Sequence, residues 1–134
     1  MRAVEAEIHG AGDVVKTRLF FCGHLCGDFV LRELADVIRV TMRKEDRFAR
    51  SGGEEFVIVL VEASRDEAMN VAERIRRSVA EHEFHFETQP LHLTISIGVA
   101  TTSGDLAMNS SNLLKIADEN LYTAKRTGRD RVVG

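Results

Sequence analysis

Residues 50–61 read Arg-Ser-Gly-Gly-Glu-Glu-Phe-Val-Ile-Val-Leu-Val, and this stretch decides the fold. Gly52 and Gly53 have no Cβ and can adopt positive φ, so they predict the exposed turn of a hairpin that a ligand can approach closely. Successive side chains of a strand face opposite ways, so either Glu54 or Glu55 can ligate a hard cation such as Mg²⁺ while the other faces elsewhere. Taken alone, two glycines beside two acids are more often a solvated hairpin tip.

Strands are predicted on both sides of this turn, from the patterns of their side chains. The hairpin joins residues 46–51 to residues 56–61, and the second arm is a continuous apolar run typical of a central strand covered on both faces. Residues 91–99 alternate strictly between apolar and polar side chains, which predicts a strand with one apolar face. Residues 131–133 predict a short closing strand.

Helices are predicted between these strands. Apolar side chains recur at helical spacing over residues 28–42. Ser64 and Glu67 have the spacing of a capping box, which starts a second helix. A last helix is predicted to begin near residue 110 and to end just before Gly128. Strands that alternate with helices indicate the α/β fold class.

The composition is that of one soluble globular domain. The chain has 134 residues, 44% hydrophobic and 29% charged, which is enough for a single core. Its net charge of −3 argues against non-specific binding to nucleic acid, which needs a basic surface. No run approaches the length of a membrane span and the first residues lack the apolar core of a signal peptide, so we expect a cytoplasmic protein. Cys22, His24 and Cys26 fall short of the four ligands of a closed zinc site.

Six ordered segments resemble a known family. They are Gly23–Asp28, Arg43–Asp46, Arg50–Phe56, Ala72–Arg76, Thr94–Ala100 and Ala117–Arg129. With this spacing, residues 23–134 resemble the GGDEF family, whose members are diguanylate cyclase domains, and residues 1–22 are a divergent amino-terminal segment. The resemblance implies a palm-type fold with a central, mostly antiparallel sheet flanked by helices.

The reaction that the resemblance implies is a nucleotidyl transfer. In the family, two domains meet face to face as a homodimer, each holding one GTP. The 3′-hydroxyl of each nucleotide attacks the α-phosphate of the other, which gives cyclic di-GMP and two pyrophosphates. Mg²⁺ or Mn²⁺ is the expected cofactor. A regulatory domain or partner is also expected, because these domains usually follow a regulatory module.

The hairpin residues take catalytic roles under this resemblance. Glu54 matches the carboxylate that ligates the metal, and Glu55 matches a second acid that assists the metal or the attacking hydroxyl. Gly52 and Gly53 match the positions where the backbone reaches the phosphates.

Substrate-binding roles carry over to three further positions. Lys125 and Arg129 match the basic pair that binds the triphosphate, where arginine can contact phosphate through two N–H groups and lysine supplies a point charge. Asp28 matches the residue that reads guanine, although from the residues alone it is a helix N-cap. His24 is interpreted as a structural residue rather than a general base.

A second constellation matches the family's product-binding inhibitory site. Arg43 and Asp46 stand at the Arg-x-x-Asp positions, and Arg74 matches the additional arginine that completes the site. Guanidinium groups stack on guanine and contact phosphate, while a carboxylate accepts from a guanine edge. The alternative is an exposed ion pair between residues 43 and 46 that contributes little.

The amino-terminal segment departs from the family pattern. Members carry Asp-x-Asp-x-Phe-Lys-x-x-Asn-Asp with the first aspartate thirteen residues ahead of the histidine. Counting back from His24 places that aspartate on Ala11 and the asparagine on Leu19, so both side chains are replaced. Asp13 and Lys16 are either remnants of the motif or ordinary surface charges.

Which segment completes the sheet stays open in the sequence. Residues 3–10 lack the long apolar run of a buried central strand, whereas residues 14–21 have the β-branched and aromatic content of a strand. The leading hypothesis is a diguanylate cyclase domain whose activity is impaired by this divergent first strand. The alternatives are a non-catalytic receptor for cyclic di-GMP or GTP, and a structural dimerisation domain.

Overall fold

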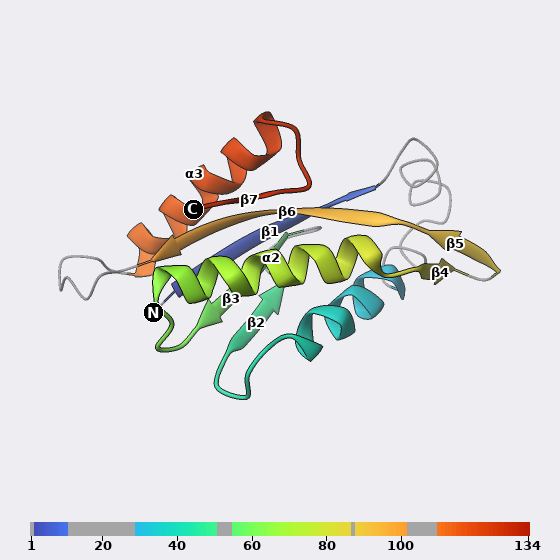
Figure 1. Ribbon diagram of the computed structural model, residues 1–134, viewed down its shortest axis with the longest axis horizontal. Coiled ribbons are helices and arrows are strands. Elements are labelled where there is room, and N and C mark those ends of the chain that lie inside the picture. Colours follow the sequence, from blue (N-terminus) through green and yellow to red (C-terminus); the bar gives the residue numbers. More distant parts are fainter. Residues whose placement is uncertain (1, 11–28, 51–54, 87, 102–109) are drawn as a thin grey trace.

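The computed structural model describes residues 2–10, 29–50, 55–86, 88–101 and 110–134. The strands are β1 (Arg2–Gly10), β2 (Arg47–Arg50), β3 (Glu55–Leu60), β4 (Phe84–Phe86), β5 (Gln89–Leu91), β6 (Leu93–Thr101) and β7 (Val132–Val133). Residues 29–40 are helical, and the later helices are α2 (Arg65–Glu81) and α3 (Ser110–Arg126). A five-stranded sheet has the order β2-β3-β1-β6-β7, and β4 pairs with β5 in a small second sheet (Figure 1).

β1 occupies the centre of the large sheet. It pairs antiparallel with both β3 and β6, so that Ala6 lies opposite Phe56 on one side and Ile97 on the other. Residues 2–10 therefore complete the sheet, because pairing with β6 along the whole strand and with β3 over residues 2–7 satisfies its backbone groups even where its sequence lacks a long apolar run. The alternative segment, residues 14–21, lies outside the described residues. The division of the chain at residue 22 stays a prediction about sequence resemblance.

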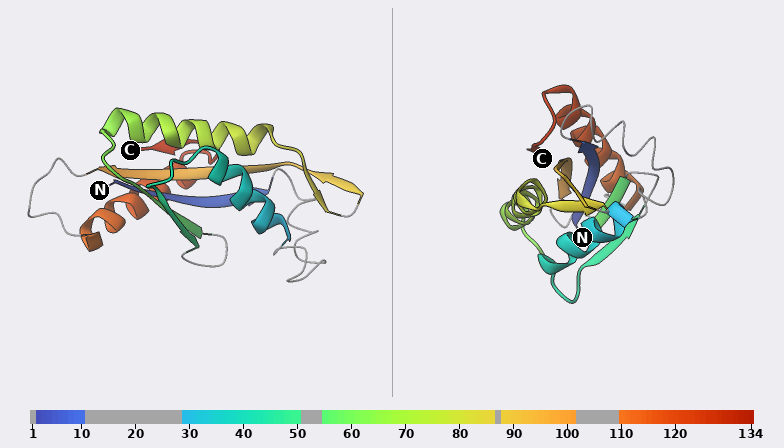
Figure 2. Two further views of the ribbon diagram at one scale, coloured as in Figure 1. Left: turned by 90° about the horizontal axis from the view of Figure 1, so that it is seen from below. Right: turned by 90° about the vertical axis from the view of Figure 1, so that its right-hand side faces the viewer.

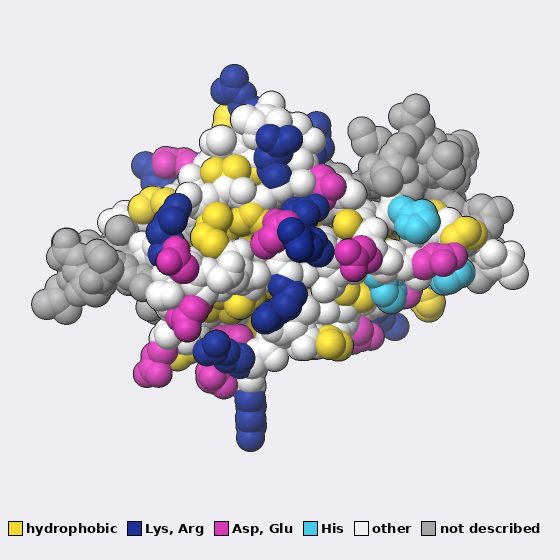
Figure 3. Space-filling view, viewed as in Figure 1, with side chains coloured by type: hydrophobic (Ala, Val, Ile, Leu, Met, Phe, Trp, Pro, Cys, Tyr) yellow, Lys and Arg dark blue, Asp and Glu magenta, His cyan; other side chains and the backbone are white. Residues whose placement is uncertain are grey.

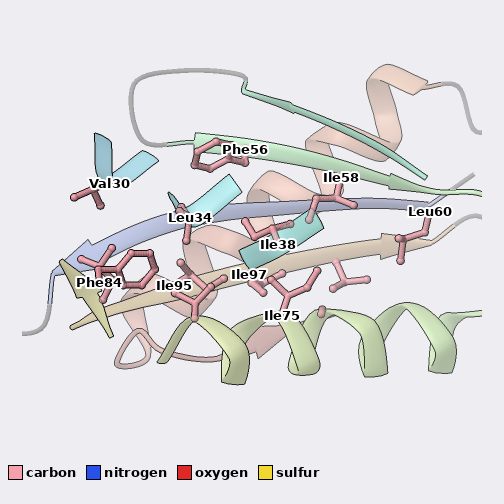
Figure 4. Close-up of a cluster of buried hydrophobic side chains, with 14 of the residues drawn as sticks. Val30, Leu34, Ile38, Phe56, Ile58, Leu60, Ile75, Phe84, Ile95 and Ile97 are labelled. Carbon is pink, nitrogen blue, oxygen red and sulfur yellow. The ribbon is translucent and has the colours of Figure 1, made fainter. Parts of the chain in front are cut away.

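The helices cover the two faces of the sheet. α2 and residues 29–40 lie on one face, and α3 lies over β6, β1 and β7 on the other (Figures 1 and 2). Between the first two helices and the sheet is the main core, drawn in Figure 4. Its largest fully buried side chains include Leu34, Ile38, Ile58, Ile75 and Ile97.

The predicted apolar face of β6 is confirmed, because its large side chains belong to the main core, and the opposite face is buried as well. Ile95 and Ile97 belong to the main core, whereas Ser96 and Gly98 are buried on the α3 side. A Cβ on Gly98 would lie 2.1 Å from the carbonyl oxygen of Ala117. The alternation in the sequence therefore separates large side chains on the main-core face of β6 from small ones on the α3 face. Only small residues fit on that second face, because the backbone of α3 approaches it closely.

β3 is less buried than predicted, because one of its two faces is only partly covered. Phe56, Ile58 and Leu60 are buried, but Val57 and Val59 on the other face are only half-buried. α3 lies over β6, β1 and β7, which leaves this face of β3 less covered than a continuous apolar run predicts.

The predicted helices are confirmed. Ser64 Oγ accepts a hydrogen bond from the Glu67 N–H at 3.2 Å, and the Glu67 carboxylate accepts from the Ser64 N–H at 2.7 Å, which is a capping box. The apolar positions predicted for the first and last helices include seven buried residues: Val30, Leu34, Ile38, Leu113, Ala117, Leu121 and Ala124.

Candidate functional site

β2 and β3 form the predicted hairpin. They are antiparallel, with Arg50 opposite Phe56. The rings of Phe48 and Phe56 stack with centroids 5.3 Å apart, which holds the two arms together near this end. The guanidinium of Arg39, on the helix over residues 29–40, lies 5.7 Å from the centre of the Phe48 ring. The hairpin arms are thus fixed to that helix by apolar and cation–π contacts.

Several predicted positions cannot be placed, because they lie outside the described residues. They are Ala11, Asp13, Lys16, Leu19, Cys22, His24, Cys26, Asp28, Gly52, Gly53 and Glu54. Their assignments therefore stay predictions.

The strand register brings two chain segments to the same end of the sheet. Phe56 lies opposite Ala6, and Ala6 lies opposite Ile97. Ile97 in turn pairs with Val132, so these four residues form one row across β3, β1, β6 and β7. β3, β6 and β7 run in the same direction, so the first residues of β3 and β7 lie at one end of the sheet. With about 4.8 Å between adjacent strands, they are separated by about 14 Å, close enough for one nucleotide-sized ligand to contact both.

Glu55 is the predicted catalytic residue that falls within the described residues. It is half-buried at the start of β3, opposite Glu7 of β1. In the described part of the chain, no group of three or more His, Cys, Asp or Glu side chains could hold a metal ion. A carboxylate at the hairpin together with ligand phosphates nevertheless fits Mg²⁺, which is usually bound by one or two carboxylates and substrate oxygens.

The predicted basic pair lies at the carboxyl end of α3. Lys125 is half-buried in the last turn of the helix, and Arg129 is exposed just beyond it. Gly128 has a φ of +126°, and the Arg129 N–H donates to the carbonyl of Ala124 at 3.0 Å. This is the glycine-terminated helix end that the sequence predicted. Arg129 and Asp130 are left-handed too, with φ of 61° and 44°.

An ion-pair chain joins this turn to α2. Arg76 Nε and one terminal nitrogen donate to the two oxygens of Glu73, at 2.9 and 2.7 Å, and the other terminal nitrogen reaches Asp130 Oδ1 at 2.7 Å. Arg77 also donates to Glu73, at 3.0 Å. The hydrogen bonds from Arg76, and to a lesser extent from Arg77, lower the pKa of Glu73, and Glu73 and Asp130 together raise the pKa of Arg76.

The sequence analysis missed this chain. The i, i+3 spacing of Glu73 and Arg76 on a predicted helix was a usable signal for half of it. Arg76 and Asp130 are 54 residues apart in the sequence, so no local pattern predicts their ion pair.

The predicted inhibitory residues surround the turn between residues 40 and 47. Both oxygens of Asp46 accept from backbone groups, the Arg43 N–H at 2.8 Å and the Val61 N–H at 3.4 Å. Arg74 donates from α2 to the carbonyl of Thr41 at 3.0 Å. In place of the alternative, a side-chain ion pair between residues 43 and 46, the backbone N–H of Arg43 donates to the Asp46 carboxylate.

The Arg43 side chain is exposed on this turn. It lines a surface hollow together with Arg39, Met42 and Asp46. Arg47 closes the turn from beneath, because one of its guanidinium nitrogens lies within 3.4 Å of the carbonyl oxygens of residues 44, 45 and 46. The turn therefore holds Asp46 in place while it leaves the Arg43 guanidinium at the surface.

Charges of both signs are mixed on the face formed by α2, as Figure 3 shows. This pattern on that face agrees with the low net charge of the chain. None of the helices in the described residues is long and apolar enough to cross a membrane.

These features define an α/β domain of the palm type, in which β3 and the strand that follows the Arg129 turn begin at the same end of the sheet. The family model for the diguanylate cyclase GGDEF domain matches residues 21–131. Diguanylate cyclase A of Treponema denticola is 44% identical over 110 residues, which are 82% of this chain and 29% of that protein. Response regulator PleD of Caulobacter vibrioides is 43% identical over 114 residues, 84% of this chain and 25% of that protein.

Solved structures agree with these sequence matches. The active GGEEF domain of a diguanylate cyclase from Vibrio cholerae has a TM-score of 0.81 and 32% identity, over 98% of this chain and 80% of that one. The GGDEF domain of DgcB from Caulobacter crescentus, solved in complex with c-di-GMP, has a TM-score of 0.83 and 29% identity, over 98% of this chain and 75% of that one.

The chain belongs to the GGDEF family. It spans less than a third of the length of the curated relatives cited above. The Gly-Gly-Glu-Glu-Phe form of the signature at residues 52–56 is also the form named for the Vibrio cholerae domain.

Proposed function

We propose that this chain is a diguanylate cyclase domain that converts two GTP molecules to one cyclic di-GMP and two pyrophosphates. The observation that carries the proposal is the strand register, which brings the start of the signature strand β3 and the Arg129 turn to the same end of the sheet. The match to curated diguanylate cyclases supports the same reaction.

Each residue that the resemblance assigns to the site has its own role in the proposed reaction. Lys125 and Arg129 neutralise the triphosphate and orient it, because positioning and charge stabilisation supply most of the rate in phosphoryl chemistry. Glu55 accepts the proton of the attacking 3′-hydroxyl or assists the cation. Glu54, with the triphosphate oxygens, would hold Mg²⁺ or Mn²⁺, which supplies charge neutralisation at the phosphates when bound. Asp28 accepts hydrogen bonds from guanine.

Turnover by this chain is proposed to be slow. Ala11 offers no carboxylate for the cation and Leu19 no amide for guanine. Loss of one such charge-stabilising or positioning group commonly lowers the rate by about a hundredfold or more. Regulation by a further domain or a partner is part of the proposal, and the structural relative SiaD was solved with its activator SiaC.

The experiment is incubation of the purified chain with GTP and Mg²⁺, followed by chromatographic separation of the nucleotides. We expect slow formation of cyclic di-GMP that Glu54→Gln abolishes. Because two domains must meet, the rate per molecule should rise with protein concentration below the dimer dissociation constant. Absence of cyclic di-GMP at every protein concentration would contradict the cyclase proposal.

The second candidate is a receptor that binds cyclic di-GMP without turning over GTP. The observation that favours it is the turn after residue 40, which fixes Asp46 by two backbone bonds, leaves Arg43 exposed and is contacted by Arg74. Calorimetric titration with cyclic di-GMP should show binding that Arg43→Ala weakens by about tenfold or more. Arg126→Ala is the matched control, because this arginine lies on α3 and stacks on Tyr122.

The two candidates give different patterns. A cyclase with an inhibitory site shows both product formation and dinucleotide binding, whereas the receptor shows binding alone. Equal affinity of wild type and Arg43→Ala for cyclic di-GMP would remove Arg43 from the dinucleotide site.

A further inference from the structure

Three consecutive left-handed residues follow α3. Gly128, Arg129 and Asp130 have φ of 126°, 61° and 44°. Glycine adopts such angles freely, whereas arginine does so at a cost and aspartate at a smaller one, so surrounding contacts help to hold both residues. Backbone strain of this kind tends to persist at functional sites, so the contacts that hold Arg129 and Asp130 are informative.

The strained residues are held from two sides. Arg131 Nε donates to the carbonyl of Arg129 at 3.0 Å, and Arg76 reaches the carboxylate of Asp130 at 2.7 Å. The Arg76 side chain is 18% exposed and its guanidinium is already fixed by two hydrogen bonds to Glu73. A preorganised, partly buried arginine loses less freedom when it binds a further carboxylate than a free surface arginine does.

We infer that Arg76 is a positioning residue for Arg129, acting through Asp130. The ion pair holds Asp130 in its left-handed conformation and thereby sets the backbone from which the Arg129 side chain departs. This inference rests on the proposed function, in which Arg129 contacts the triphosphate of GTP. It adds two residues, Arg76 and Asp130, to those that determine how tightly the chain binds this substrate.

A purely structural role for the pair predicts something different. If the pair only stabilised the fold, Asp130→Gly would remove the ion pair, would offset part of that loss because glycine adopts positive φ without strain, and would leave GTP affinity unchanged. If Asp130 positions Arg129, the same change also releases the turn and weakens GTP binding. GTP affinity therefore separates the two roles, and the unfolding free energy shows whether the fold is intact.

The test measures GTP affinity by calorimetry in the presence of Mg²⁺, together with the free energy of unfolding in urea, for each variant. Arg76→Ala and Asp130→Gly should each weaken GTP binding by about five- to tenfold, and Asp130→Gly should leave the unfolding free energy close to that of wild type, because relief of the left-handed backbone offsets the lost ion pair. Asp130→Asn keeps an acceptor for Arg76 and should bind GTP within about twofold of wild type.

Two comparisons separate positioning from general disruption. Arg77→Ala is the matched control, because Arg77 also donates to Glu73 but no hydrogen bond joins it to Asp130 in the described part of the chain. It should change GTP affinity by less than about twofold. In the Arg129→Ala background, Arg76→Ala should cause no further loss, because Arg76 acts only through Arg129.

The outcomes that contradict the inference are distinct from those that contradict the proposed function. Wild-type affinity in Arg76→Ala, with weakened binding in Arg129→Ala, overturns the inference and leaves the substrate site standing. An additive loss in the double variant overturns it as well. Wild-type affinity in Arg129→Ala removes Arg129 from the GTP site and the inference with it. No GTP binding by wild type overturns the proposed function itself.

Discussion

The turn over residues 41–46 and the turn over residues 128–131 both present an arginine that matches a ligand-binding position of the family, yet they are built differently. The first is held by backbone hydrogen bonds to one carboxylate, that of Asp46, and its Arg43 side chain is exposed. The second is held in a left-handed conformation by an ion-pair chain that starts on α2. The 41–46 turn is held by backbone hydrogen bonds to its own carboxylate and leaves the Arg43 side chain exposed. The 128–131 turn has a left-handed backbone and is held by a contact from another element.

α2 contacts both turns. Arg74 donates to Thr41 of the first, and Arg76 donates to Asp130 of the second. Residues two apart on an α-helix project about 200° apart, so the helix contacts the two turns with opposite flanks. The comparison teaches that one helix can contact two turns, each proposed to bind a ligand, through different side chains, so each turn should respond to its own substitutions.

The largest expected effect comes from Gly98→Ala. This change displaces α3, so it should disturb the 128–131 turn and leave the 41–46 turn intact. An added Cβ would lie 2.1 Å from the Ala117 carbonyl oxygen and 2.3 Å from the Leu121 nitrogen, both backbone atoms of the helix. We expect a loss of about 3 kcal/mol in the free energy of unfolding, measured in urea. GTP binding should weaken, because α3 carries the 128–131 turn, while cyclic di-GMP binding should persist.

Ser96→Ala is the control for this change. Ser96 is buried on the same strand, and its Oγ has no hydrogen-bond partner among the described residues. An apolar replacement there should be neutral or stabilising. A similar loss in both variants would mean that β6 tolerates no substitution, and the specific clash with α3 would be unsupported.

An intermediate effect is expected from Asp46→Ala, which tests the first turn. The change leaves the Arg43 and Val61 N–H groups without their carboxylate partner, so we expect a loss of about 1–2 kcal/mol in unfolding free energy and loss of cyclic di-GMP binding. Asp46→Asn retains one acceptor oxygen, so its unfolding free energy and its affinity for cyclic di-GMP should lie between those of wild type and Asp46→Ala. GTP affinity that drops together with dinucleotide affinity would show that the turns are not independent.

The smallest expected effect is on the pH dependence of stability. The pKa of Glu73 is lowered from its ordinary value of 4.5, chiefly by its hydrogen bonds with Arg76. A carboxyl whose folded pKa is lowered stabilises the fold above its unfolded pKa, and this contribution is lost as the pH falls through the folded pKa. Because Glu73 is 37% exposed, the contribution is below about 1 kcal/mol.

Urea unfolding of wild type and Glu73→Gln at several pH values measures this contribution. The difference in unfolding free energy between the two proteins should be constant near neutral pH and shrink below about pH 4.5. A difference that does not change down to pH 2 would show that the Glu73 charge does not stabilise the ion pairs with Arg76 and Arg77.

The sequence was most informative where a pattern is local. The capping box of Ser64 and Glu67, the glycine end of α3 and the hairpin arms all depend on neighbouring residues, and the structure confirms them. It was least informative for contacts between distant elements. The place of β1 at the centre of the sheet depends on two partners whose identity no local pattern reveals, and the Arg76–Asp130 pair spans 54 residues.

For β3 and β6, the sequence predicted burial correctly only on the face that carries the large apolar side chains of the main core. β6 looked one-sided because Ser96 and Gly98 are small or polar, yet their size is what lets α3 approach. β3 looked two-sided because Val57 and Val59 are apolar, yet α3 lies over other strands. Side-chain character predicts which residues can be buried, and the position of a distant helix decides which of them are.

The central claim is that a diguanylate cyclase domain is limited by two positions of its first motif, and rescue of turnover tests it most directly. Cyclic di-GMP formed from GTP and Mg²⁺ is measured for wild type, for Ala11→Asp with Leu19→Asn, and for Ala11→Asn with Leu19→Asn as the uncharged control. We predict slow turnover in wild type and an increase of about tenfold or more in the first variant alone, because only it restores both the carboxylate and the amide. Rapid turnover by wild type that neither variant increases would contradict the claim.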